Sequence, residues 1–419
     1  MIKIIIKILL PFSIILFMFP LSINSQWYPQ NSGINTTLYA VDFLDTLNGY
    51  VCGDSGKILK TTDGGSTWIN LLTSGVGFPL YSVGFLDSQN GCAVGGSGNS
   101  GIIIRTTNGG TSWTQISSPA NSHVVSVQFI NSTTGFLTTL SGQSLGSTNG
   151  GLTWSALNNQ ISTHGNHNGA FFINATVGYV CEDGGYVSKT TDGGHTWNDA
   201  FNGIPTSDPL YAINFINVNT GFTAGANGSI YETTDAAGSW QAAYYDTSMA
   251  NYYCTGTINK DTAYVAGQFG YIIETSDMGN NWYKEPSGVN TILYGIQFVT
   301  PNSGWIVGQN GVILHTNNGG AIGIKKISNN VPADYSLSQN YPNPFNPSTN
   351  IKFEISKTSL VKLLVYDETG KLVETLLNQK LNPGKYEITW NAVKYASGVY
   401  FCRLLTDGFE QSKKMILAK

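Results

Sequence analysis

Short apolar segments separated by turns rich in Gly, Asn and Asp run along the chain from residue 27 to about residue 317. The first group contains four such segments, LYAVDFL (38–44), GYVCG (49–53), KILKT (57–61) and STWINL (66–71). The same four segments return in a later group at 211–216, 221–225, 229–233 and 239–243. Segments of this length between such turns are typical of β-strands. The pattern therefore predicts repeated units of four short strands, which we label A to D.

One turn recurs before the last strand of each unit. It reads TTDGGSTW, TTNGGTSW, STNGGLTW, TTDGGHTW, TTDAAGSW and TSDMGNNW, and it ends at Trp68, Trp113, Trp154, Trp197, Trp240 and Trp282. Successive tryptophans are 41 to 45 residues apart. A repeat of this length with four strands per unit is the signature of β-propeller blades. We therefore predict an all-β fold built on a propeller.

The last unit lacks its fourth strand. It contains LYGIQFV, GWIVG and VILHT, but its turn TNNGGAIG has Gly323 where the tryptophan would stand. The segment WYPQNSG (27–33) parallels WYKEPSG (282–288). We predict that this segment supplies the outer strand of a seventh blade, with Trp27 at the equivalent position. Such a closure leaves no unpaired seam in the ring.

The recurrent turn resembles the Asp-box, S/T-x-D-x-G-x-T-W, of sialidases, sortilin-type receptors and several secreted propellers. We expect its Asp or Asn to accept N–H bonds within the turn, its glycines to permit positive φ and its tryptophan to pack between blades. Six near-copies cannot all be active sites, so we assign these residues a structural role. Besides the tryptophans above they are Asp63, Asn108, Asn149, Asp192, Asp235 and Asp277.

The wider unit, F-x-D/N-x-x-x-G-Y/F-V-x-G-x-x-G-x-I-x-x-T-T-D-G-G-x-T-W, is similar to the repeats of the photosystem II stability and assembly factor family. The resemblance implies the propeller architecture, since the same repeat occurs in many exported bacterial proteins. Plant and cyanobacterial members present an arginine-rich patch. The propeller region here contains a single arginine, Arg105, so that partner surface is not expected.

Residues 1–25 have the pattern of a secretory signal peptide. Lys3 and Lys7 precede an apolar run over 8–23, and small polar residues follow it. A membrane anchor is the alternative, but the run is short for a bilayer and contains Pro11 and Pro20. We predict cleavage after Ser25 and no transmembrane segment in the mature chain.

The composition changes near residue 330, from a Gly-rich acidic region to a Lys-rich basic one. Six further strands are expected at 349–355, 360–366, 372–377, 384–390, 398–406 and 410–417. This pattern predicts a small Ig-like β-sandwich. The predicted organisation is a signal peptide, a propeller, a linker and a sandwich, at 1–25, 26–324, 325–334 and 335–419.

The sequence NYPNPFNPST (340–349), followed by VYDETGKLV, ASGVYFCRL and a terminal KKMILAK, resembles the type A sorting domain of the type IX secretion system. The resemblance implies a passenger that enters the periplasm, crosses the outer membrane and loses this domain to a sortase-like protease. Its product is secreted or held at the outer cell surface. An Ig-like adhesive module is the alternative. The sorting motif comprises Asn340, Tyr341, Pro342, Asn343, Pro344, Phe345, Asn346 and Pro347.

Charge and cysteine content exclude several classes of function. Residues 26–324 hold 6 basic and 17 acidic side chains, which disfavours a nucleic-acid partner. The five cysteines share no paired spacing, so they predict neither a disulfide framework nor a zinc site. A sialidase is excluded because its arginine triad cannot be built. We expect no cofactor and no metal.

Candidate ligand-binding residues fall on the propeller face that carries the D-to-A and B-to-C loops, because side chains there differ between blades. They are Tyr244, Tyr245, Phe269, Asp54, Glu182, Asp183, Gln268 and Gln309. The three aromatic residues predict a stacking platform for a sugar or protein ligand. The alternative is that they pack between blades five and six.

Two further patterns on this face suggest chemistry. Glu182 and Asp183 replace a Gly-containing turn, and with Asp54 they could act as acid and base in a glycoside hydrolase. His164 and His167 form HGNH, which could supply two metal ligands, but no third ligand stands nearby in the sequence. We expect a solvated loop there.

The sequence thus predicts an exported, non-enzymatic binding or scaffold propeller for a glycan or protein ligand. Two alternatives stay open: a secreted polysaccharide-active glycoside hydrolase, and an assembly or stability factor for a membrane complex.

Overall fold

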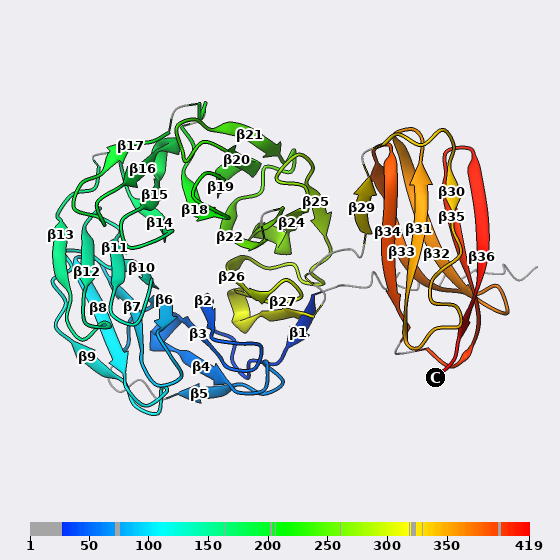
Figure 1. The fold of residues 1–419 in the computed structure, drawn as a ribbon. Coiled ribbons are helices and arrows are strands. Elements are labelled where there is room, and N and C mark those ends of the chain that lie inside the picture. Colours follow the sequence, from blue (N-terminus) through cyan, green and yellow to red (C-terminus); the bar gives the residue numbers. More distant parts are fainter. Residues whose placement is uncertain are drawn as a thin grey trace, which may run out of the picture.

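The computed structural model describes residues 27–419 apart from 72–75, 163, 202, 206, 260, 318, 320–323, 329 and 393–394. The expected signal peptide lies outside the described residues. Seven four-stranded antiparallel sheets form a ring, and two more form a separate unit beside it (Figure 1). The expected all-β fold is confirmed. In the part of the chain that is described, no helix is long and apolar enough to cross a membrane.

The first six blades follow the chain order A to D, from the channel outward. Blade one consists of β2 (Leu38–Phe43), β3 (Gly49–Gly53), β4 (Ile58–Thr61) and β5 (Ile69–Leu71). Blade two consists of β6 (Leu80–Phe85), β7 (Gly91–Ser97), β8 (Ser100–Thr106) and β9 (Thr114–Ile116). Blade three consists of β10 (Val124–Phe129), β11 (Gly135–Thr139), β12 (Ser144–Ser147) and β13 (Ser155–Asn158). Blade four consists of β14 (His167–Phe172), β15 (Gly178–Glu182), β16 (Val187–Thr190) and β17 (Asn198–Asp199). Blade five consists of β18 (Leu210–Phe215), β19 (Gly221–Gly225), β20 (Ser229–Thr233) and β21 (Gln241–Tyr245). Blade six consists of β22 (Tyr252–Asn259), β23 (Thr262–Gly267), β24 (Ile272–Thr275) and β25 (Tyr283–Glu285).

Both ends of the propeller region build blade seven. Its inner strands are β26 (Leu293–Thr300), β27 (Ser303–Gly308) and β28 (Ile313–Thr316), and its outer strand is β1 (Tyr28–Gln30). β1 pairs antiparallel with β28, placing Tyr28 opposite His315. The N-terminal segment therefore supplies the strand that the last repeat lacks, and the ring closes without an unpaired seam.

The turn before each outer strand is held by its own side chains. In blade one, Asp63 accepts hydrogen bonds from the backbone N–H of Thr67 (2.9 Å) and from its hydroxyl (2.7 Å). The Thr61 hydroxyl accepts from the Gly65 N–H at 2.8 Å. These bonds keep Thr67 in the turn, so the outer strand begins at Ile69 rather than at residue 66 as expected. The same network surrounds Asn108, Asn149, Asp192, Asp235 and Asp277.

Aromatic side chains wedge neighbouring blades together. At five of the blade interfaces, a ring on strand B stacks on a Phe of the next blade's strand A. The pairs are Tyr50–Phe85, Phe136–Phe172, Tyr179–Phe215, Tyr264–Phe298 and Trp305–Phe43. The turn tryptophan then meets the edge of that Phe, as Trp113 does with Phe85 at 5.9 Å. Trp113, Trp154, Trp240 and Trp282 are buried, whereas Trp68 and Trp197 are half-buried.

The second unit is a sandwich of two four-stranded sheets. One sheet has the order β29-β34-β31-β30 and the other β33-β32-β35-β36. Their bounds are β29 (Ile324–Ser328), β30 (Ser336–Leu337), β31 (Ser348–Ile355), β32 (Ser359–Asp367), β33 (Leu372–Leu381), β34 (Gly384–Asn391), β35 (Gly398–Thr406) and β36 (Phe409–Leu417). Buried residues of both sheets, Trp390 and Phe353 among them, form one core.

Part of the expected linker forms a strand in the structure. Residues 325–328, predicted as linker, belong to β29, which pairs with β34. This pairing covers an edge of the sheet that would otherwise expose its backbone groups. The sequence did not indicate the strand because its partner lies about 60 residues further along the chain.

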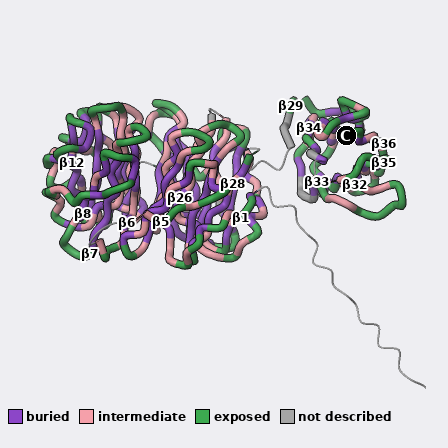
Figure 2. The backbone as a smooth tube through the Cα atoms, turned by 90° about the horizontal axis from the view of Figure 1, so that it is seen from below, coloured by how far each residue is buried: buried purple, intermediate pink, exposed green. Residues whose placement is uncertain are grey.

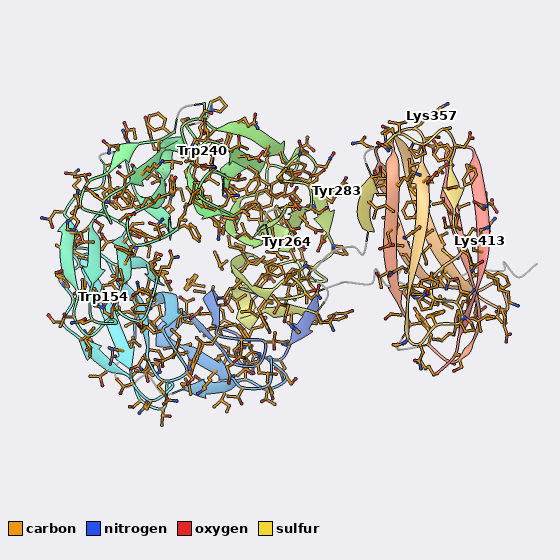
Figure 3. The ribbon with its side chains drawn as sticks, in the orientation of Figure 1. Trp154, Trp240, Tyr264, Tyr283, Lys357 and Lys413 are labelled. Atoms are coloured by element: carbon orange, nitrogen blue, oxygen red, sulfur yellow. The ribbon has the colours of Figure 1, made fainter. Side chains whose placement is uncertain are left out.

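The two units meet at the rim of blade six. Tyr283 lies at the propeller edge that faces the sandwich and packs against the sandwich core (Figure 3). Asn382 donates a hydrogen bond to Asn281 at 3.2 Å. Elsewhere the buried residues of the propeller lie within the blades and the exposed ones at their connecting loops (Figure 2).

Candidate functional site

Five inner strands carry a tyrosine at their second residue: Tyr39, Tyr81, Tyr211, Tyr253 and Tyr294. Inner strands begin at the face that carries the D-to-A and B-to-C loops. All five rings therefore stand at one mouth of the central channel. We call this set the tyrosine arc.

The rings of the tyrosine arc touch in sequence around the channel. Centroid distances are 5.2 Å for Tyr81–Tyr39, 5.3 Å for Tyr39–Tyr294, 5.3 Å for Tyr294–Tyr253 and 5.0 Å for Tyr253–Tyr211. His123 extends the arc beyond Tyr81 at 5.3 Å. The arc thus runs through six blades, and each tyrosine is half-buried.

Two carboxylates stand at the mouth with the tyrosine arc. The Tyr39 hydroxyl donates to Asp54 at 2.9 Å, and Asp54 lies in η1 (Asp54–Gly56), the B-to-C turn of blade one. In blade four, Asn168 takes the position of the tyrosine and donates to Asp183 at 2.9 Å. Asp183 begins the equivalent turn, η2 (Asp183–Gly185). Two of the three carboxylates predicted as ligand candidates, Asp54 and Asp183, therefore belong to the channel mouth.

The phenols of Tyr39, Tyr81 and Tyr294 stay protonated at neutral pH. Burial raises the pKa of Tyr39, and the hydrogen bond to Asp54 raises it further. Burial likewise raises the pKa of Tyr81 and Tyr294, with Asp54 adding to the effect. The mouth therefore offers neutral hydroxyl groups and aromatic rings beside two carboxylates.

The other predicted candidates lie around this mouth or inside the blades. Gln268, in η4 (Gln268–Gly270), accepts from the Asn251 N–H at 2.9 Å, and Gln309 is half-buried in η5 (Gln309–Gly311). Phe269 is 53% exposed. Tyr244 packs against the core shared by blades five and six, as in the alternative interpretation. The side chain of Tyr245 lies outside the described residues.

Glu182 does not face the ligand side as expected, because it is fully buried. Its carboxylate accepts from the Ser188 hydroxyl at 2.6 Å and from the Ser162 hydroxyl. Blades one, two, five, six and seven have glycine here, where a Cβ would meet a backbone carbonyl of the D-to-A loop at 2.0–2.3 Å. In blade four the loop instead turns its polar side chains toward the carboxylate.

The HGNH loop is solvated only at Gly165 and Asn166, because its two histidines turn inward. His167 is buried with its Nε2 3.6 Å from a Glu182 oxygen, and His164 Nδ1 lies 3.9 Å from the same oxygen. His164 also stacks on Tyr186 at 3.9 Å. Within the described residues, no group of three or more His, Cys, Asp or Glu side chains has the arrangement of a metal site. The loop is drawn inward by the buried carboxylate.

Below the mouth, a carboxylate links three neighbouring blades. Asp42 on β2 accepts from the Phe85 N–H of blade two at 2.7 Å and from the Gln297 amide of blade seven at 3.0 Å. Burial raises the pKa of Asp42 to about 6, although both hydrogen bonds oppose the shift.

Asp42 should make the propeller more stable in mild acid. Its pKa in the folded protein lies above the unfolded value of 3.8. Its contribution to the free energy of unfolding is therefore complete below pH 3.8 and is lost as the pH rises through about 6. On going from pH 8 to pH 5, we expect the wild type to gain about 1 kcal/mol of unfolding free energy relative to Asp42→Asn. Denaturant unfolding of both proteins at the two pH values measures this, and parallel pH dependences would contradict it.

The tyrosine arc was missed by the sequence analysis although a signal was present. The dipeptide Leu-Tyr opens the inner strands of blades one, two, five and seven, and Tyr-Tyr opens that of blade six. The candidates were residues that differ between blades, whereas these tyrosines recur at one position, which is also the pattern of a structural residue.

Two family models match the chain. "Secretion system C-terminal sorting domain" matches residues 339–418. The C-terminal unit is a sorting domain. "Photosynthesis system II assembly factor YCF48" matches residues 20–121 and 200–288, and the propeller resembles that factor. With its sorting domain, the chain is exported by type IX secretion to the cell surface or the extracellular space.

Solved structures support the propeller fold. YCF48 bound to D1 peptide is 21% identical with a TM-score of 0.60, covering 70% of this chain and 96% of its own. YCF48 from Cyanidioschyzon merolae is 19% identical with a TM-score of 0.59, covering 70% and 98%. PorZ, a type IX secretion component of Porphyromonas gingivalis, is 15% identical with a TM-score of 0.57, covering 93% of this chain and 60% of its own. No curated protein sequence matches the chain.

Proposed function

We propose that the exported propeller is a non-enzymatic binding module whose ligand sits at the channel mouth on the tyrosine arc. The observation that carries this proposal is the contact of five half-buried tyrosines in one arc at a mouth of the central channel. Tyrosine, which combines an apolar ring with a polar hydroxyl group, is enriched where proteins bind ligands.

The charge of the mouth favours an uncharged or basic ligand. Asp54 and Asp183 stand with the arc, and both carboxylates and π-faces attract cations. The few basic side chains of the propeller are in part used within the fold. Lys60 and Lys189 each donate to a backbone carbonyl of the next blade at 2.8 Å, and Arg105 donates to Asn90. A basic peptide segment is the ligand class that this arrangement fits best.

The similarity to YCF48 supports a peptide ligand only at the level of fold, since one solved YCF48 structure holds a D1 peptide. A glycan is the alternative ligand, because tyrosines and carboxylates also bind neutral sugars. The hydrolase alternative used Glu182 and Asp183 with Asp54, and of these three carboxylates Glu182 is fully buried. A role as an assembly factor would use the same mouth for a membrane-protein segment.

Calorimetric titration of the mature chain with a set of lysine-rich decapeptides and a set of neutral hexasaccharides tests the proposal. We expect at least one peptide to bind, and Tyr253→Ala with Tyr294→Ala to weaken it about tenfold or more. Phe269→Ala is the matched control, since this exposed ring on the same face lies outside the arc.

Each outcome distinguishes a different site. Affinity lost in Phe269→Ala but kept in the arc variants would move the site to the predicted aromatic platform. Binding of hexasaccharides alone would keep the site and replace the ligand class. Melting temperatures of all variants separate lost binding from lost folding.

A further inference from the structure

Three side chains of the motif 340–347 make contacts within the sandwich or with the end of the chain. Buried Asn340 donates to the Thr349 hydroxyl at 2.9 Å. Asn343 accepts from the Ile416 N–H at 2.8 Å and donates to the Lys414 carbonyl at 3.2 Å. Phe345 is buried, and its ring centroid lies 5.4 Å from that of Trp390. Its backbone N–H donates to the Ile416 carbonyl, and its own carbonyl accepts from the Ala418 N–H. These residues have an internal structural role.

Tyr341 is the large aromatic side chain of the motif that faces outward. Its backbone is fixed by two 2.9 Å hydrogen bonds with Asn350, but its side chain is 80% exposed, the highest value for a large apolar side chain among the described residues. In the described part of the chain, its hydroxyl group has no hydrogen-bond partner. A large ring held outward by a rigid backbone loses little freedom on binding.

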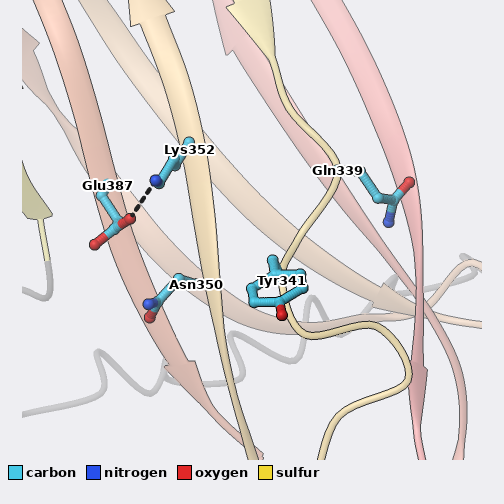
Figure 4. A pocket seen from close by; sticks show the side chains of 5 residues that line it. All are labelled: Gln339, Tyr341, Asn350, Lys352 and Glu387. Carbon is cyan, nitrogen blue, oxygen red and sulfur yellow. Dashed lines mark ion pairs between the residues drawn. The ribbon is translucent and has the colours of Figure 1, made fainter.

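The ring borders a shallow hollow on the sheet surface. Gln339, Tyr341, Asn350, Lys352 and Glu387 line it (Figure 4). Lys352 and Glu387 form an ion pair at 3.3 Å, and Gln339 is tied to the Lys414 carbonyl at 2.7 Å. The polar groups around the ring are therefore largely satisfied by one another. What the surface offers to a partner is chiefly the Tyr341 ring.

We propose that Tyr341 is the recognition residue of the sorting domain, inserted into an apolar pocket on an acidic surface of the type IX secretion machinery. The sorting-domain match identifies the partner's class, and the structure assigns the residue. An acidic surface follows from charge, because residues 325–419 hold 13 basic and 8 acidic side chains. The contact buries one aromatic ring, as in interface hot spots.

Export of the full chain from a type IX-secreting bacterium tests this proposal. We expect Tyr341→Ala to reduce the surface and extracellular fraction about tenfold or more, with folded chain accumulating in the periplasm. Tyr341→Phe should export like the wild type, because it keeps the ring. Phe401→Ala is the matched control, since this ring on β35 is also exposed (37%) but lies outside the hollow.

Three results would overturn the proposal. One is normal export of Tyr341→Ala. Another is poor export accompanied by a lower melting temperature of the periplasmic chain, which would make the ring part of the fold. The third is loss of export in Tyr341→Phe, which would assign recognition to the hydroxyl group instead of the ring.

Discussion

Replacement of Trp27 by alanine is expected to lower the free energy of unfolding by about 3–5 kcal/mol, the range for a buried aromatic truncated to alanine. The indole is fully buried, meets Phe298 and Tyr264 edge-on at 5.8 and 6.2 Å, and donates to Glu285 at 3.0 Å. Its loss leaves a cavity where the first strand of the chain joins the last blade.

The neighbouring carboxyl groups add to this effect. Glu285 and Glu274 are both buried next to Tyr264, and burial raises the pKa of Glu274. Removing the indole N–H takes a donor away from a buried carboxyl group, which costs more than an exposed hydrogen bond would. We therefore expect Trp27→Phe, which fills space but cannot donate, to be destabilised by an intermediate amount.

Chemical denaturation of the mature chain measures both variants, with Trp68→Ala as the comparison. Trp68 occupies the equivalent position in blade one but is only half-buried, so its loss should be smaller. Equal stability of Trp27→Ala and wild type would mean that the ring does not depend on closure by its N-terminal strand.

Replacement of Glu182 by alanine is expected to destabilise blade four by about 3–5 kcal/mol, because it leaves buried polar partners without their acceptor. Ser162, Ser188 and His167 all converge on this carboxylate. Burial lowers the pKa of His167, whereas Glu182 opposes that shift, so the variant should also hold this histidine more firmly in its neutral form.

Thermal unfolding of Glu182→Ala and of Asp199→Ala provides the matched pair. Asp199 contacts the same cluster through His164 at 3.7 Å but is 58% exposed, and its loss should change stability little. A Glu182→Ala protein that melts like the wild type would show that the cluster is not structural and would reopen a chemical role for this residue.

Local sequence determined the repeat and its turns. Each Asp-box closes through hydrogen bonds between residues two to four positions apart, so the pattern TTDGGSTW encodes its own geometry. The period of these turns fixed four strands per blade, and the unmatched Gly323 and Trp27 pointed to the closure. The sorting domain was equally legible, because its motif is one continuous segment.

The tertiary structure decided whatever depends on residues far apart in the chain. Tyr39 meets Tyr294 only because the ring closes, and β29 becomes a strand only because β34 offers an unpaired edge. The burial of Glu182 depends on the path of a loop that the repeat does not specify. Hydrophobic periodicity and turn chemistry are local quantities, whereas contacts across a channel or along a sheet edge follow from how the blades are arranged around the ring.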